Sequence, residues 1–116
     1  MRVHDIIEPL QAEILVDANR QREITGGYCG DLLSDCIANA FEGCVWVTIQ
    51  SHPNIVAVAV LTDMAAVVIA NSQEHNEQTL AKARQEGVVL LRTAMTSYQA
   101  VAVLSGLGIP GARKHR

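Results

Sequence analysis

Short runs of β-favouring residues alternate with helix-patterned segments along the chain, and this alternation constrains the fold more than any other feature. The clearest strand is residues 44–50, which include the run Val-Trp-Val-Thr-Ile. The other strands are expected at 12–17, 24–28, 65–70 and 88–91. Strands that alternate with helices predict a parallel sheet with both faces covered. The expected fold is therefore α/β, a three-layer domain with a mainly parallel sheet covered by helices.

The spacing of apolar side chains and the capping residues predict the helices. Their expected ranges are 3–10, 31–41, 54–62, 76–86 and 96–107. Residues 54–62 are apolar at nearly every position, so periodicity alone also allows a strand there. Pro53 favours the helix, because proline is well suited to a first turn. The 116 residues are expected to form a single domain, 1–110, followed by a disordered basic tail, 111–116.

Composition excludes several classes of partner. Aromatic residues make up 3% of the chain and the formal net charge is −3, so neither stacking platforms nor a basic footprint for nucleic acid is present. The longest apolar run, 55–61, is too short to span a membrane, and the N-terminus lacks the apolar core of a signal peptide. The three cysteines lack CxxC spacing, which indicates small packing residues in a reducing compartment. We expect a cytoplasmic protein.

The glycines near residue 27 do not form a phosphate-binding loop. A P-loop requires a lysine directly after its last glycine, but the first lysine of the chain is Lys82. Asp31 and Asp35 are spaced to share a helical face, and with His52 they could supply oxygen and nitrogen ligands to a metal. In the alternative interpretation Asp31 caps its helix and Asp35 is solvated. We expect no enzyme activity and no cofactor.

Three strand-to-helix turns are expected to meet at one edge of the sheet. They contain Gly30 and Asp31, His52, and Thr93. In open parallel sheets ligands bind beyond the carboxyl ends of the strands, where helix N-termini offer free N–H groups to anions. His52 either contacts such an anion or only caps its own helix. These turns therefore predict a site for a small anionic metabolite or nucleotide.

Residues 23–27, Glu-Ile-Thr-Gly-Gly, followed by Cys-Gly-Asp-Leu-Leu-Ser-Asp at 29–35, resemble the DRTGG family, which is named after its five-residue signature. Further similarity lies at 47–52, 54–59 and 90–93, and the resemblance covers roughly residues 6–109. Glu23 and Ile24 replace the Asp and Arg of the signature. The intact part is Thr25, Gly26 and Gly27.

Members of this family occur as an N-terminal module of HPr kinases and of some phosphotransacetylases, within CBS-domain pyrophosphatases, and as stand-alone proteins. The resemblance implies a regulatory or dimer-forming module rather than kinase chemistry. The two alternatives are a ligand-independent adaptor that docks onto a partner enzyme, and a metal-dependent hydrolase or phosphotransferase. The candidate ligand-binding or interface residues are Thr25, Gly26, Gly27, Gly30, Asp31, His52 and Thr93.

A homodimer is expected for two reasons. The helix at 54–62 is apolar all round, and such a helix must be buried on every side, so a second subunit would serve as its lid. Gly26 and Gly27 lack side chains, which allows a close approach of another backbone or of a ligand. We therefore expect the region of Thr25, Gly26 and Gly27 to lie in the dimer interface.

Overall fold

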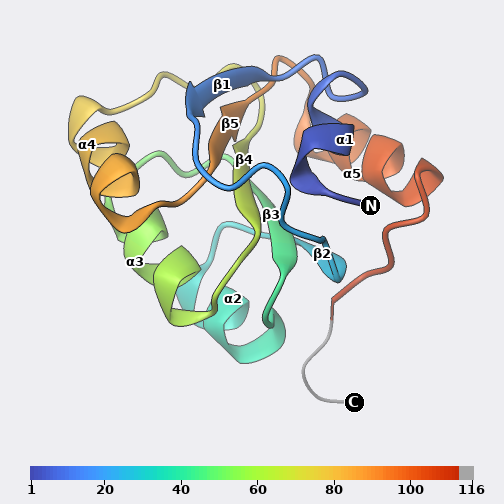
Figure 1. The fold of residues 1–116 in the computed structure, drawn as a ribbon, viewed down its shortest axis with the longest axis horizontal. Helices are drawn as coiled ribbons and strands as arrows, with labels where there is room; N and C mark the ends of the chain where they lie inside the picture. The colour runs from blue at the N-terminus through green and yellow to red at the C-terminus, as the bar shows by residue number, and fades with distance from the viewer. Residues whose placement is uncertain (113–116) are drawn as a thin grey trace.

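A five-stranded sheet forms the centre of the computed structural model, which describes residues 1–112 (Figure 1). The strands are β1 (Glu13–Val16), β2 (Gly26–Cys29), β3 (Cys44–Thr48), β4 (Ala66–Ile69) and β5 (Leu90–Arg92), in the spatial order β1-β5-β4-β3-β2. The strands from β2 to β5 are parallel, and β1 is antiparallel to β5. The predicted α/β class with a mainly parallel sheet is confirmed.

Helices cover both faces of the sheet. They are α1 (Val3–Ile7), α2 (Leu33–Asn39), α3 (Asn54–Leu61), α4 (Glu77–Glu86) and α5 (Ser97–Gly106). The segment that could also have been a strand is helical, with Pro53 at its N-cap. The capping box between Thr96 and Gln99 starts α5 as predicted. None of the helices in residues 1–112 is long and apolar enough to cross a membrane.

The sheet separates two hydrophobic cores. The first lies under α2, α3 and α4, and the second lies under α1 and α5 (Figure 1). Strand β3 is buried along its whole length, and its alternate residues enter opposite cores: Trp46 enters the first, whereas Val45 and Val47 enter the second. This full burial explains why β3 is apolar up to its last residue, Thr48. The predicted three layers are confirmed.

We expected that a single subunit could not bury α3 on every side, and the structure agrees with this expectation. Val60 is 46% exposed and Leu61 is 69% exposed, and Ala57 is also exposed. The helix lies on one face of the sheet between α2 and α4, so its neighbours reach only part of its circumference. An apolar outer surface therefore remains on α3.

The described chain continues past residue 111, where the tail was expected to start, and contacts the sheet there. Gly111 forms a parallel bridge with Gly27, and the Ala112 N–H donates to the Gly27 carbonyl at 2.6 Å. These two residues were expected to belong to a disordered tail, yet they pair with the edge of the sheet. Residues 113–116 lie outside the described part of the chain. We call residues 109–112 the C-terminal segment.

Candidate functional site

The candidate residues lie at two opposite ends of the sheet. Thr25 and Gly26 are at the amino end of β2, whereas Gly30 and Asp31 follow its carboxyl end. His52 follows the carboxyl end of β3 and Thr93 follows that of β5. Because these strands are parallel, the last four residues share one rim and the first two are excluded from it. We call this rim, at the carboxyl ends of β2 to β5, the carboxyl rim.

Thr25 fixes the start of β2 to the loop before β3. Its hydroxyl donates to the Glu42 carbonyl at 2.6 Å, and its N–H donates to the Gly43 carbonyl at 3.0 Å. A Cβ atom on Gly43 would lie 2.7 Å from the Thr25 side chain, so the two residues fit only with glycine at position 43. Thr25 therefore has a structural role at the amino end.

The glycine pair of β2 admits the chain's own C-terminal segment. The Gly27 N–H donates to the Pro110 carbonyl at 2.8 Å. A Cβ atom on Gly26 would lie 3.2 Å from that same carbonyl oxygen and 3.4 Å from the Ala112 Cβ. The sequence interpretation offered a ligand or a second subunit as the approaching partner. In the structure the backbone that approaches these glycines belongs to the same chain.

Asp31 fastens the β2–α2 turn to β3. Its carboxylate accepts from the Thr48 hydroxyl and from the Ile49 N–H, both at 2.8 Å. Helix α2 begins after Leu32 without a side-chain cap, so the interpretation of Asp31 as a helix cap is wrong. The neighbouring Gly30 carbonyl accepts from the Trp46 indole N–H at 2.9 Å. This turn is therefore held by hydrogen bonds within the subunit.

His52 and Thr93 also make internal contacts. His52 is exposed, and its Nδ1 accepts from the Asn54 N–H at 3.1 Å, which agrees with the capping interpretation. Thr93 is buried, and its hydroxyl donates to the Leu10 carbonyl at 2.7 Å. The Thr93 carbonyl accepts from the Ser72 N–H at 3.0 Å. Thr93 thus joins the end of α1 and the β4–α4 loop to β5.

The carboxyl rim offers few free donors to an anion. His52, Asn76 and Thr96 accept hydrogen bonds from N–H groups at the starts of α3, α4 and α5. The Arg92 guanidinium on this rim is already 2.6 Å from the Glu13 carboxylate. An anionic ligand would have to displace these internal partners, at the cost of the interactions they make.

The three proposed metal ligands are not assembled into a site. Among residues 1–112, no group of three or more His, Cys, Asp and Glu side chains is placed to hold a metal ion. The Asp35 carboxylate instead accepts hydrogen bonds from the Tyr28 hydroxyl and from the Asn39 amide. Burial, assisted by this carboxylate, raises the pKa of Tyr28 above its usual value. The contacts of Asp35 join α2 to the edge strand β2.

Cys36 and Cys44 are packing residues as predicted, whereas the same prediction is wrong for Cys29. Cys36 and Cys44 are buried in the core under α2, and Cys29 is exposed at the end of β2. Burial raises the pKa of Cys36 to about 12 and also raises the pKa of Cys44 and of Cys29. Thiols with raised pKa values are poor nucleophiles at neutral pH.

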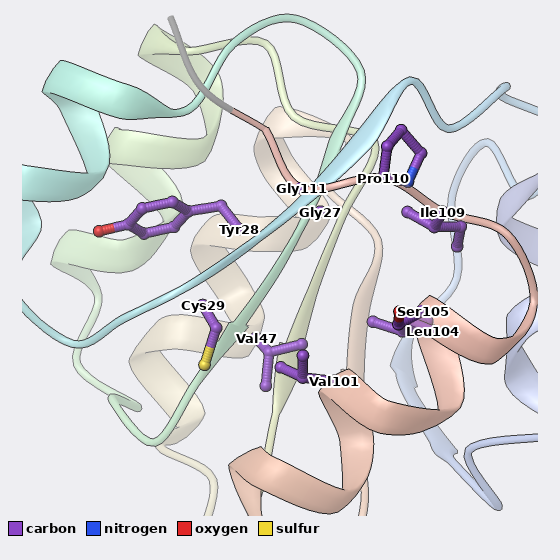
Figure 2. Close-up of a pocket in the computed structure, with 10 residues that line it drawn as sticks. All are labelled: Gly27, Tyr28, Cys29, Val47, Val101, Leu104, Ser105, Ile109, Pro110 and Gly111. Carbon is purple, nitrogen blue, oxygen red and sulfur yellow. The ribbon is translucent and has the colours of Figure 1, made fainter. Parts of the chain in front are cut away.

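A groove between β2 and α5 was not predicted from the sequence (Figure 2). Its volume is about 160 Å³, and we call it the β2–α5 groove. The buried side chains of Val47, Leu104 and Ile109 form its floor, and Val101 and Ser105 stand at its open side. The groove exists because the C-terminal segment returns to β2. In the sequence, only Gly26 and Gly27 indicated that another backbone approaches β2 closely.

Comparisons with known proteins support the fold. No family model matches the chain, and no curated protein matches it. A similar solved structure is the crystal structure of the CBS and DRTGG domains of the regulatory region of Clostridium perfringens pyrophosphatase, complexed with its activator diadenosine tetraphosphate. The match has a TM-score of 0.68 and 12% sequence identity, and it covers 89% of this chain and 45% of that chain.

This similarity establishes a related α/β fold. That structure is of a regulatory region, and this chain spans less than half the length of that chain. The comparison thus agrees with the α/β fold predicted from the alternation of strands and helices.

Proposed function

We propose that this chain is a non-catalytic, cytoplasmic regulatory domain of the DRTGG type that acts as a homodimer. Two observations support the regulatory part. The fold is similar to that of a pyrophosphatase regulatory region, and the motif core of Thr25, Gly26 and Gly27 is present. The lack of a P-loop and of a metal-ligand group in residues 1–112 supports the non-catalytic part.

The outer face of α3 is the observation that carries the dimer. It consists of the exposed residues Ala57, Val60 and Leu61, and Ile37 on the adjacent helix α2 is 37% exposed. The spacing of Ala57, Val60 and Leu61 places them on one side of α3, and exposed apolar patches mark interaction sites on soluble proteins. A twofold axis would place each patch against its own copy and bury both at once. The full burial of one such aliphatic side chain contributes about 1.5–3 kcal/mol.

The α3 face replaces the glycine pair as the proposed interface. The C-terminal segment already covers Gly26 and Gly27, so a second subunit would first have to displace it. In the α3 interface no internal contact must be broken. The Thr25 region then supports the fold of each subunit instead of joining the two.

Ligand sensing is the second part of the proposal. The similar regulatory region binds diadenosine tetraphosphate, which is an anionic nucleotide. In this chain such a ligand would bind at the carboxyl rim and would displace the caps provided by His52 and Thr96. Dimerisation has the stronger support of the two parts. The α3 face is already exposed, whereas a ligand at the carboxyl rim would have to displace internal hydrogen bonds.

Sedimentation equilibrium tests the dimer. The expected result for the wild type at micromolar concentration is twice the 12.5 kDa chain mass. Leu61→Glu should shift the equilibrium to the monomer, because the interface would then contain two unpaired charges. Gln85→Glu adds the same charge to an exposed position of α4 and should stay dimeric. A monomeric wild type with a folded circular dichroism spectrum contradicts the dimer.

A thermal-shift titration tests the ligand. Diadenosine tetraphosphate or ATP that binds only the folded state must raise the melting temperature. A rise that is reduced by His52→Ala would support binding at the carboxyl rim. If neither nucleotide changes the melting temperature while the dimer persists, the ligand-independent adaptor becomes the better description.

A further inference from the structure

We propose that the β2–α5 groove is a binding site for a small, uncharged, apolar ligand of about the size of one aromatic ring. The C-terminal segment forms one wall of this site. The groove lies on the α1 and α5 side of the sheet, opposite the outer face of α3. The proposal is therefore independent of the proposed dimer.

The lining determines the chemical class of the ligand. Among residues 1–112, no Asp, Glu, Lys, Arg or His side chain lines the groove, and its floor is the aliphatic surface of Val47, Leu104 and Ile109. Tyr28 contributes to the lining, but its hydroxyl is directed away and donates to Asp35 on the other side of the sheet (Figure 2). A charged ligand would lose hydration without gaining an oppositely charged partner among the described lining residues, so the groove favours an uncharged one.

The volume determines the size of the ligand. An apolar protein cavity of about 150 Å³ is known to hold benzene, whereas typical drug-sized or cofactor sites occupy about 300–1,000 Å³. At about 160 Å³ the groove has room for one ring or a branched alkyl group. A nucleotide is too large for it.

The C-terminal segment couples the ligand to the edge of the sheet. The Gly27 N–H and carbonyl are both paired with this segment, so the wall leaves neither polar group of Gly27 free toward the groove. The segment begins after Gly108, whose φ of +94° requires glycine and sets the change of direction. A ligand that needs this wall binds only when the C-terminal segment is docked. Its binding free energy therefore stabilises the docked state over the detached state. Ligand binding and docking of the segment are therefore linked.

An NMR titration of the full chain with toluene and with benzoate tests the site. These two probes share a ring, but only benzoate carries a charge. Toluene should shift the methyl signals of Val47, Val101 and Leu104 and should slow hydrogen exchange at the Gly27 and Ala112 amides. Benzoate should leave these signals unchanged. The proposal is overturned if toluene moves none of these signals up to its solubility limit, or if benzoate binds as tightly.

Two substitutions on α5 locate the site. Ser105→Phe fills the open side of the groove and should weaken toluene binding by about tenfold or more. Ala102→Phe adds the same ring to an exposed residue that does not line the groove, and it should bind toluene like the wild type. Val101→Phe fills the groove from a second position if Ser105→Phe does not fold. Toluene affinity that survives a folded groove-filling variant places the ligand elsewhere and overturns the proposal.

Discussion

The two edges of the sheet are protected against unwanted pairing by different devices. At one edge, β1 runs antiparallel to β5, its register shifts between Ile14 and Val16, and Glu13 forms an ion pair with Arg92. At the other edge, β2 has the uncharged sequence Gly-Gly-Tyr-Cys and is covered by the C-terminal segment. Irregular register and charge discourage a further strand, whereas a covering segment occupies its place.

The comparison shows that a sheet edge can be protected against further pairing either by features of the edge strand or by a tertiary contact with a distant segment. At the β1 edge the irregular register and the charged residue Glu13 belong to the edge strand itself, which is also paired with the distant strand β5. The β2 edge depends on a segment more than eighty positions away in the chain. Substitutions at the β2 edge or in the C-terminal segment should therefore reduce the free energy of unfolding more than matched substitutions at the β1 edge.

The largest effect is expected for Ile109, the buried residue of the C-terminal segment. Ile109→Ala should reduce the free energy of unfolding by about 2–4 kcal/mol, because Ile109 is buried in the second core. Ile14→Ala, the matched change on β1, should cost less than about 1 kcal/mol, since Ile14 is already 36% exposed. Urea unfolding measures both variants. Equal losses would show that the two edges do not differ in this way.

A smaller effect is expected when a side chain at position 26 blocks the close approach of the C-terminal segment to β2. Gly26→Val should destabilise the protein by about 1–3 kcal/mol, because its Cβ would lie 3.2 Å from the Pro110 carbonyl oxygen. Faster hydrogen exchange at the Ala112 amide would report the displaced segment. Gly111→Ala is the control, since a Cβ there has no atom within 4 Å. A Gly26→Val protein with wild-type stability and exchange would refute the close fit.

The Tyr28 side chain should make the β2 edge sensitive to high pH. Its pKa is raised in the folded state by burial and then by the hydrogen bond to Asp35. A raised pKa gives a stabilising contribution that is complete below the unfolded value of about 10 and is lost as the pH rises above it. Wild type should therefore lose about 0.5–1.5 kcal/mol more than Tyr28→Phe between neutral and strongly alkaline pH. Identical pH profiles in urea unfolding would contradict this role.

The smallest effect is expected at the ion pair of the β1 edge. Glu13 is largely exposed, so Glu13→Gln should cost only about 0.2–1 kcal/mol. The difference should shrink at high salt, because mobile ions screen exposed charges. Unfolding measured at low and high ionic strength checks both statements. A loss that is large and independent of salt would assign Glu13 a buried structural role.

The elements of the fold were predictable because their signals are local. Proline at the start of α3, the capping box of α5 and the glycine after α4 each act within a few residues. The apolar pattern of α3 also predicted that one subunit alone would leave part of the helix exposed. The return of residues 109–112 to β2 was not predictable, because it pairs positions distant in sequence and carries no local signal.

The candidate site was predictable in part. The carboxyl rim follows from strand direction, which correctly groups Gly30, Asp31, His52 and Thr93. The same argument excludes Thr25, because it precedes its strand. What the sequence could not provide was the set of hydrogen-bond partners. Asp31 binds β3 rather than the start of α2, a choice decided by the tertiary placement of Thr48 and Ile49.

Both ends of the described chain lie against the same short stretch of backbone. The Ile24 N–H donates to the Met1 carbonyl at 2.9 Å, and three residues later Gly27 is paired with Pro110 and Ala112. Tension applied between the two ends would therefore act first on these few hydrogen bonds and not on the buried strands. Under a weak pull the C-terminal segment should detach while the five-stranded sheet stays intact. The domain would then extend by a short, fixed length before it unfolds.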